Sequence, residues 1–153
     1  MKRFILTLLI LLPVMANAQS DSFKKYLNRH NGKSGFTTIE IPGQMLSLMQ
    51  GENAESADVF KRTERLTLII CESYDSEKRE EADEMIRQGG YQLMTAINNE
   101  GNEVRIYAIL KKNNSSNEFL MQVTSEDDMV LISILGDIDL KDVSNFSNIG
   151  TSK

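Results

Sequence analysis

Few residues in this chain are suited to chemistry, and they are widely separated. His30 is the only histidine and Cys71 the only cysteine among 153 residues, and there is no tryptophan. A serine triad needs a histidine near its nucleophile, and no nucleophile-elbow pattern is present. A zinc site needs three or four ligands, and phosphate-binding glycine loops are absent. The sequence therefore predicts no catalytic residue, no metal ligand and no cofactor. His30 falls near the end of an exposed first helix, where helix termination or plain exposure is the expected explanation.

Acidic residues supply the remaining candidates. Asp137 and Asp139 follow the last apolar run, but their spacing does not match a twelve-residue calcium loop. Capping of a short helix by Asp139 explains them equally well, so they stay weak candidates for carboxylate chemistry. A second acidic group forms one face of a predicted helix, for which solvation is the default and a cation or basic-partner site the alternative. Its members are Glu77, Glu80, Glu81, Asp83 and Glu84.

The one thiol is expected to be structural. Cys71 ends the apolar run RLTLIIC, which favours a small buried side chain over a reactive one. With a single cysteine, no intramolecular disulfide can form.

Residues 1–18 have the pattern of a secretory signal peptide. Lys2 and Arg3 precede an apolar stretch, and Ala16-Asn17-Ala18 forms a small-residue cleavage site. The stretch is too short for a spanning helix, and no cysteine follows the site, so neither a membrane span nor a lipoprotein anchor is expected after cleavage. We expect one globular domain over 19–148, a flexible tail over 149–153, and export to the periplasm or beyond.

The charge balance narrows the classes of partner. The net charge is −5 and becomes more negative when Lys2 and Arg3 are removed. An acidic domain without a basic stripe argues against nucleic acid and against a polybasic contact with anionic lipid.

The chain is organised around residues 91–140, whose pattern predicts four consecutive antiparallel strands. Apolar residues alternate with polar ones, which is the strand period, and the runs are separated by polar turns at 99–102, 113–116 and 125–128. Four-residue turns place Ile97 opposite Val104, Leu110 opposite Phe119 and Val123 opposite Val130. The apolar rows then share one face. They comprise Tyr91, Leu93, Ile97, Val104, Ile106, Ala108, Leu110, Phe119, Met121, Val123, Val130, Ile132 and Ile134.

The second face of these strands is mixed. Lys111 would lie opposite Glu118, a favourable cross-strand pair. The apolar residues of this face are either covered by helices or loops of the same chain or form a partner or dimer surface. These residues, our candidate interaction surface, are Met94, Tyr107, Ile109, Leu120, Leu131 and Leu135.

The residues before the meander add helices and strands. Helices are expected over 20–31, 42–51 and 76–88, strands over 36–41 and 66–71, and a solvated connection over 52–63. Two strands joined by a helix suggest a parallel pair with a right-handed crossover. The predicted fold is α+β: a single domain with a mainly antiparallel sheet of about six strands and helices mostly on one face.

Several phrases resemble domain-of-unknown-function family 4252, a family of small exported proteins of Bacteroidetes-type bacteria. They are IPGQMLSLMQ, Tyr91-Gln92-Leu93-Met94, Val104-Arg105-Ile106-Tyr107 and the ending Leu131 to Leu140. The resemblance covers essentially the whole mature chain. It implies export and single-domain size, and it supplies no functional residues.

These observations favour a non-catalytic binding or regulatory domain of the bacterial envelope. Its partner is expected to be an envelope protein or a second copy of the chain. The alternative is a small-ligand-binding protein or a carboxylate-dependent enzyme acting on an envelope component.

Overall fold

The computed structural model describes residues 19–48, 54–111 and 116–143. Its elements are α1 (Asp21–His30), β1 (Phe36–Pro42), α2 (Gly43–Leu48), α3 (Ala54–Arg62), β2 (Thr63–Cys71), α4 (Ser76–Gln88), β3 (Gln92–Asn99), β4 (Asn102–Ile109), β5 (Asn117–Thr124) and β6 (Met129–Gly136). The predicted leader and the predicted tail lie outside the described residues.

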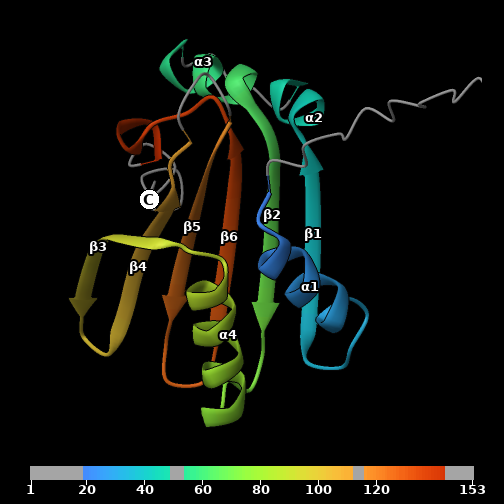
Figure 1. Cartoon of the computed structure of the whole chain (residues 1–153), viewed down its shortest axis with the longest axis vertical. Helices are drawn as coiled ribbons and strands as arrows, with labels where there is room; N and C mark the ends of the chain where they lie inside the picture. The colour runs from blue at the N-terminus through green and yellow to red at the C-terminus, as the bar shows by residue number, and fades with distance from the viewer. Residues whose placement is uncertain (1–18, 49–53, 112–115, 144–153) are drawn as a thin grey trace, which may run out of the picture.

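All six strands form one antiparallel sheet in the order β1-β2-β6-β5-β4-β3 (Figure 1). The α+β prediction and the four-strand meander are confirmed. The predicted parallel pairing of β1 and β2 is wrong, because Phe36 pairs with Cys71 and Pro42 with Arg65. Both α2 and α3 lie at the end of the sheet where β1 finishes, so β2 starts at that end and runs back beside β1. No crossover over the face of the sheet is needed.

The register of the meander agrees with the prediction at two turns and differs at the third. Ile97 pairs with Val104 and Val123 with Val130, as expected. Phe119 pairs with Ala108, two residues from the predicted partner Leu110, and Ile109 instead of Lys111 pairs with Glu118. A shift of two residues preserves the side-chain period, so the apolar rows of β4, β5 and β6 still share one face.

A β-bulge breaks the expected row in β3. Leu93 pairs with Tyr107, but Thr95 pairs with Ile106, so one extra residue lies between these pairs. Leu93 therefore shares a face with Tyr107, on the other side of the sheet from Ile97.

Two helices cover the face that carries Tyr107, Leu120 and Leu131, which we call the helix-covered face (Figure 1). The side chain of Ser20 caps α1 by accepting from the N–H of Phe23, and that of Asp75 caps α4 by accepting from the N–H of Lys78. Both caps confirm the predicted helix starts. The apolar sides of the helices meet the sheet in one core of Phe23, Tyr26, Leu27, Ile69, Cys71, Ala82, Met85, Ile86, Tyr91, Tyr107, Leu120, Met129 and Leu131.

A smaller core lies on the opposite face, at the end of the sheet near α3. Ala108, Phe119 and Ile134 pack there with Val59 of α3 and with two residues that follow β6, Ile138 and Val143. The predicted solvated connection over 52–63 is therefore wrong, since 54–62 are helical and bring Val59 into a core.

Candidate functional site

The candidate interaction surface lies largely inside the protein. Tyr107, Leu120, Leu131 and Leu135 are buried, the first three beneath α1 and α4. Ile109 is half-buried against the same core, and Met94 is 37% exposed. Of the two interpretations of this face, coverage by the chain's own helices is the one that the structure shows.

Within residues 19–48, 54–111 and 116–143, only α3 and the residues after β6 pack on the opposite face. On this face, two further rows of side chains cross all six strands. In the middle of the sheet they adjoin the smaller core, of which Ile106 and Met121 are buried members, whereas the other members are exposed or half-exposed. We call the two rows the open rows: Ile39, Leu68, Ile132, Met121, Ile106 and Thr95, then Thr37, Ile70, Val130, Val123, Val104 and Ile97. Ten of the twelve are aliphatic, two are threonines, and none is charged.

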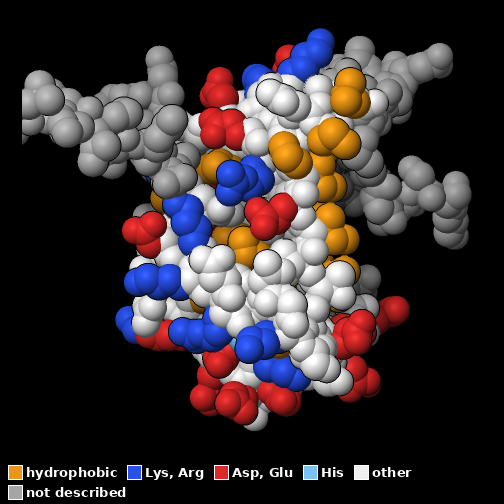
Figure 2. All heavy atoms as spheres, turned by 90° about the vertical axis from the view of Figure 1, so that its right-hand side faces the viewer, with side chains coloured by type: hydrophobic (Ala, Val, Ile, Leu, Met, Phe, Trp, Pro, Cys, Tyr) orange, Lys and Arg blue, Asp and Glu red, His pale blue; other side chains and the backbone are white. Residues whose placement is uncertain are grey.

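The two ends of the open rows are the most accessible. Ile39 in β1 is 42% exposed and Ile97 in β3 is 54% exposed. Beside β1, α2 adds Met45 and Leu48, which are 52% and 79% exposed. Figure 2, in which the β1 edge faces the viewer, shows hydrophobic side chains gathered along one margin from α2 down the sheet. The periodicity of the sequence placed the meander members of these rows on one face, but it did not indicate that this face is the more exposed one.

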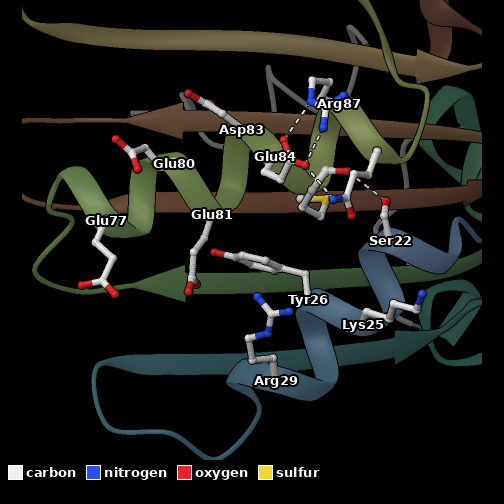
Figure 3. A pocket seen from close by; sticks show the side chains of 12 residues that line it. Ser22, Lys25, Tyr26, Arg29, Glu77, Glu80, Glu81, Asp83, Glu84 and Arg87 are labelled. Atoms are coloured by element: carbon white, nitrogen blue, oxygen red, sulfur yellow. Dashed lines mark hydrogen bonds and ion pairs between the residues drawn. The ribbon is translucent and has the colours of Figure 1, made fainter.

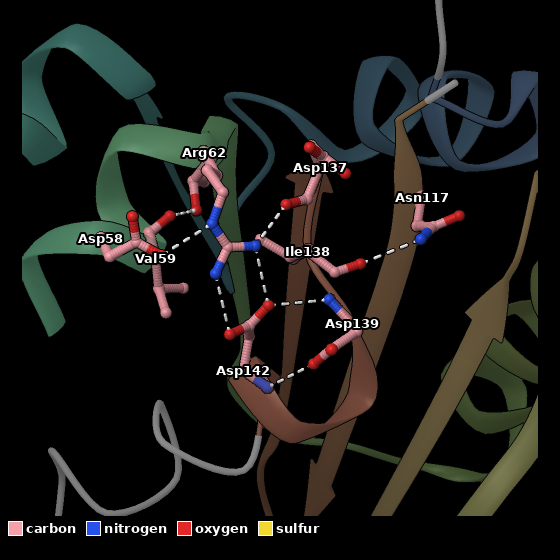
Figure 4. Close-up of polar contacts among 9 residues, drawn as sticks. Asp58, Val59, Arg62, Asn117, Asp137, Ile138, Asp139 and Asp142 are labelled. Atoms are coloured by element: carbon pink, nitrogen blue, oxygen red, sulfur yellow. Dashed lines mark hydrogen bonds and ion pairs between the residues drawn. The ribbon is translucent and has the colours of Figure 1, made fainter. Parts of the chain in front are cut away.

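The aspartates after β6 serve a structural cluster (Figure 4). Asp139 and Asp142 cap each other, each accepting from the other's backbone N–H at 2.9 Å, which confirms the predicted cap. Arg62 donates two hydrogen bonds of 3.0 Å to the Asp142 carboxylate and one of 2.6 Å to the carbonyl oxygen of Asp137. The Asp137 side chain itself is exposed, so the two weak candidates do not converge on a pocket.

The acidic side of α4 lines a groove of about 690 Å³ against α1 (Figure 3). Lys25 and Arg29 of α1 face it, and within α4 Arg87 binds Glu84 at 2.5 Å. Glu81 lies 2.8 Å from the Nε2 atom of His30. Cations of the same protein therefore occupy part of the acidic face, and no three acidic, His or Cys residues of the described ranges are arranged to hold a metal ion.

The histidine and the cysteine are both buried. His30 is the last residue of α1, as expected, but it stacks on Phe36 with 4.2 Å between ring centroids, so plain exposure is the wrong explanation for it. Burial lowers the pKa of His30, and the nearby Glu81 carboxylate opposes this shift. Cys71 has no exposed surface, as predicted, and burial raises the pKa of its thiol.

Sequence reasoning missed a buried polar cluster around Glu118. This side chain has no exposed surface and accepts hydrogen bonds from the Tyr91 hydroxyl at 2.5 Å and the backbone N–H of Ser20 at 2.7 Å. Burial raises the pKa of Glu118, and these donors oppose the shift. The partners lie 27 and 98 residues away in the sequence, so no local pattern could have revealed them.

Residues 26–146 match the model of the family described as a domain of unknown function (DUF4252), and the chain belongs to this family. Neither a curated protein nor a solved structure matches the chain. In the described ranges, none of the helices has both the length and the apolar composition that crossing a membrane requires.

Proposed function

We propose that this protein is an exported, non-catalytic binding domain of the bacterial envelope whose binding surface is the open rows. The observation that carries the proposal is that these two rows cross all six strands without a charged side chain, are mostly aliphatic, and are buried only at Ile106 and Met121. Sheets that expose such rows pack face to face in sandwich folds, with side chains of the two sheets interdigitating.

The partner that fits this surface is a second copy of the chain. In a two-fold symmetric dimer the same patch of each subunit forms the interface, so charged residues in that patch would lie near like charges of the other copy. The chain carries a net charge of −5, yet the open rows contain no charged side chain, so two copies meet there without direct repulsion. An acidic or basic partner would find no complementary charge on these twelve positions.

The size of the surface predicts a weak dimer. With strands about 4.8 Å apart and same-face residues about 6.7 Å apart, two rows across six strands cover roughly 29 Å by 13 Å. Two copies would then bury roughly 800 Å², or somewhat more with the side chains of α2, below the ~1,200–2,000 Å² of stable interfaces. Association is therefore expected to depend on concentration and to reverse on dilution.

Sedimentation velocity over a range of concentrations tests the surface, and β3 offers a matched pair of variants. Ile97 and Leu93 are 54% and 55% exposed on the same strand, but lie on opposite faces. Ile97→Asp should abolish self-association, whereas Leu93→Asp should behave as the unsubstituted protein. Circular dichroism checks that both variants fold. A monomer at the highest concentration, or equal effects of both substitutions, would refute the dimer.

Export is tested separately in cells of the source bacterium. Fractionation with N-terminal sequencing should find the protein outside the cytoplasm and beginning at Gln19. A cytoplasmic protein that retains residues 1–18 would refute the exported role.

A further inference from the structure

Glu118 lies beside the point at which the predicted leader ends. Its Oε2 atom accepts from the backbone N–H of Ser20 at 2.7 Å, and its Oε1 atom accepts from the hydroxyls of Tyr91 at 2.5 Å and Ser133 at 3.3 Å. Three donors converge on two oxygens, which favours the ionised carboxylate. The group is nevertheless fully buried, and a buried charge is costly unless an opposite charge compensates it.

The groups that donate to Glu118 are uncharged in the described part of the chain. Lys111 also favours the ionised form, but its effect on the pKa of Glu118 is smaller than those of the hydrogen bonds from Tyr91, Ser20 and Ser133. The hydrogen-bond donors thus leave the charge of the buried carboxylate without a cation among its direct partners in the described residues.

Gln19, the residue after the predicted cleavage site, is held in the same cluster. It is 4% exposed, its side-chain amide donates to Ser133 at 3.4 Å, and its amide oxygen accepts from Arg65 at 3.5 Å. Consecutive backbone nitrogens lie at most about 3.7 Å apart, and the Ser20 nitrogen lies 2.7 Å from Glu118 Oε2, so the Gln19 nitrogen lies at most about 6.4 Å from that oxygen. At that separation an opposite charge stabilises a carboxylate.

We propose that Glu118 is the receptor for the new N-terminus that leader removal creates. Hydrolysis of the Ala18–Gln19 peptide bond consumes one water and leaves a carboxylate on Ala18 and a protonated α-amine on Gln19. A neutral amide nitrogen becomes a cation beside the buried Glu118. The ion pair then holds Ser20, the cap of α1, against the sheet. This inference rests on the leader removal that the proposed function includes.

The dipole of α1 gives the effect of the new amine on stability an expected sign, with and without Glu118. A positive charge just before a helix N-terminus is unfavourable, because the first N–H groups of the helix carry partial positive charge. Without Glu118, a free amine at Gln19 should therefore weaken α1. With Glu118 it should strengthen the attachment of α1, so the effect depends on the carboxylate.

A thermodynamic cycle on the purified full domain tests this dependence. One chain begins at Gln19 and another at Asn17, which moves the amine outward by two residues; each is made with Glu118 and with Glu118→Gln. Urea denaturation should show an unfolding constant about tenfold smaller for the Gln19 start, and Glu118→Gln should remove the difference. Equal constants for the two starts, or a difference that persists in Glu118→Gln, would overturn the proposal.

A second measurement does not require Glu118→Gln to fold. Titration of the Gln19 α-amine by NMR in the unsubstituted protein should give a pKa above the ordinary range of about 7.7–8.0. A pKa within or below that range would overturn the proposal, as would loss of ammonia in the intact mass of the exported protein, since a cyclised glutamine carries no charge. Retention of the leader in cells would refute the proposed export. The thermodynamic cycle uses purified chains, so it tests the role of Glu118 independently of export.

Discussion

The bond between Arg62 and Asp142 should stabilise the fold by an amount that can be measured and assigned. Arg62 ends α3, and Asp142 lies in the helical turn after β6, so their two 3.0 Å hydrogen bonds join segments 80 residues apart. The Asp142 side chain is 14% exposed and that of Arg62 is 33% exposed. The pair is therefore less hydrated than a surface ion pair and less costly to form than a fully buried one.

Replacing Asp142 with alanine removes two charge-assisted bonds and the cap on the backbone N–H of Asp139. We expect a loss of about 2–3 kcal/mol in the free energy of unfolding, because part of the charge is still solvated. Asp58 is the matched control. It also binds Arg62, at 2.9 Å, but its side chain is 68% exposed, so Asp58→Ala should cost about 0.5 kcal/mol or less.

The pH dependence provides a second test of the same pair. The Arg62 guanidinium is the main cause that lowers the pKa of Asp142 below its ordinary 3.8. The unfolded state therefore takes up a proton first as the pH falls, and the stabilisation by Asp142 is complete above about pH 4 and lost below it. Urea denaturation between pH 7 and pH 3 should show a shallower loss in Asp142→Ala.

A double-mutant cycle with Arg62→Met and Asp142→Ala isolates the pair itself. We expect a coupling of about 1–2 kcal/mol. A coupling near zero, or equal costs for Asp142→Ala and Asp58→Ala, would show that the geometry of Figure 4 contributes no more than a surface contact.

Core packing, glycine geometry and thiol burial each give a further expectation. Leu120→Ala should cost about 2–5 kcal/mol by urea denaturation, because Leu120 is 0% exposed, whereas Leu93→Ala should cost below about 1 kcal/mol; similar costs would contradict the assignment of the two faces. A Cβ atom at Gly136 would lie 2.3 Å from a backbone oxygen at the α3–β2 junction, so Gly136→Ala should lower the melting temperature more than Gly32→Ala, where φ is +74° but the space is open. Cys71 should react with a thiol reagent only as fast as the protein opens, and a rate equal to that of denatured protein would contradict its burial.

The strands could be predicted because their information is local. Alternation of apolar residues and polar turns predicted which residues of β4, β5 and β6 share a face, and the two-residue error at Phe119 left that face unchanged. The bulge in β3, which moves Leu93 to the other face, leaves no mark in the apolar pattern. The same periodicity does not encode direction, so the pairing of β1 with β2 could not be derived from it. The helical segment that contains Val59 was missed because its sequence is polar and acidic at the start.

The location of the open surface could not be predicted, since both faces of the meander carry apolar residues. Which face the helices cover depends on where α1 and α4 reach, and α4 contributes only Ala82, Met85 and Ile86 to the core. Glu118 was interpreted as the partner of Lys111 across two strands. In the structure Glu118 is fully buried and accepts from the N–H of Ser20, a contact that no spacing within the meander indicates.

The strand order also determines when the chain can fold during synthesis. The hairpins of the meander join neighbouring segments, but β2 takes its second partner from β6, which begins 58 residues after β2 ends. Because closing such a long loop costs more entropy than closing a hairpin, docking of β2 on β6 is expected late in folding. A chain still on the ribosome is therefore expected to carry β1 and β2 with their apolar sides uncovered until residues 129–136 emerge. The N-terminal strands bury their apolar side chains fully only when β6 pairs with β2. A chain truncated before β6 is therefore expected to aggregate instead of folding in part.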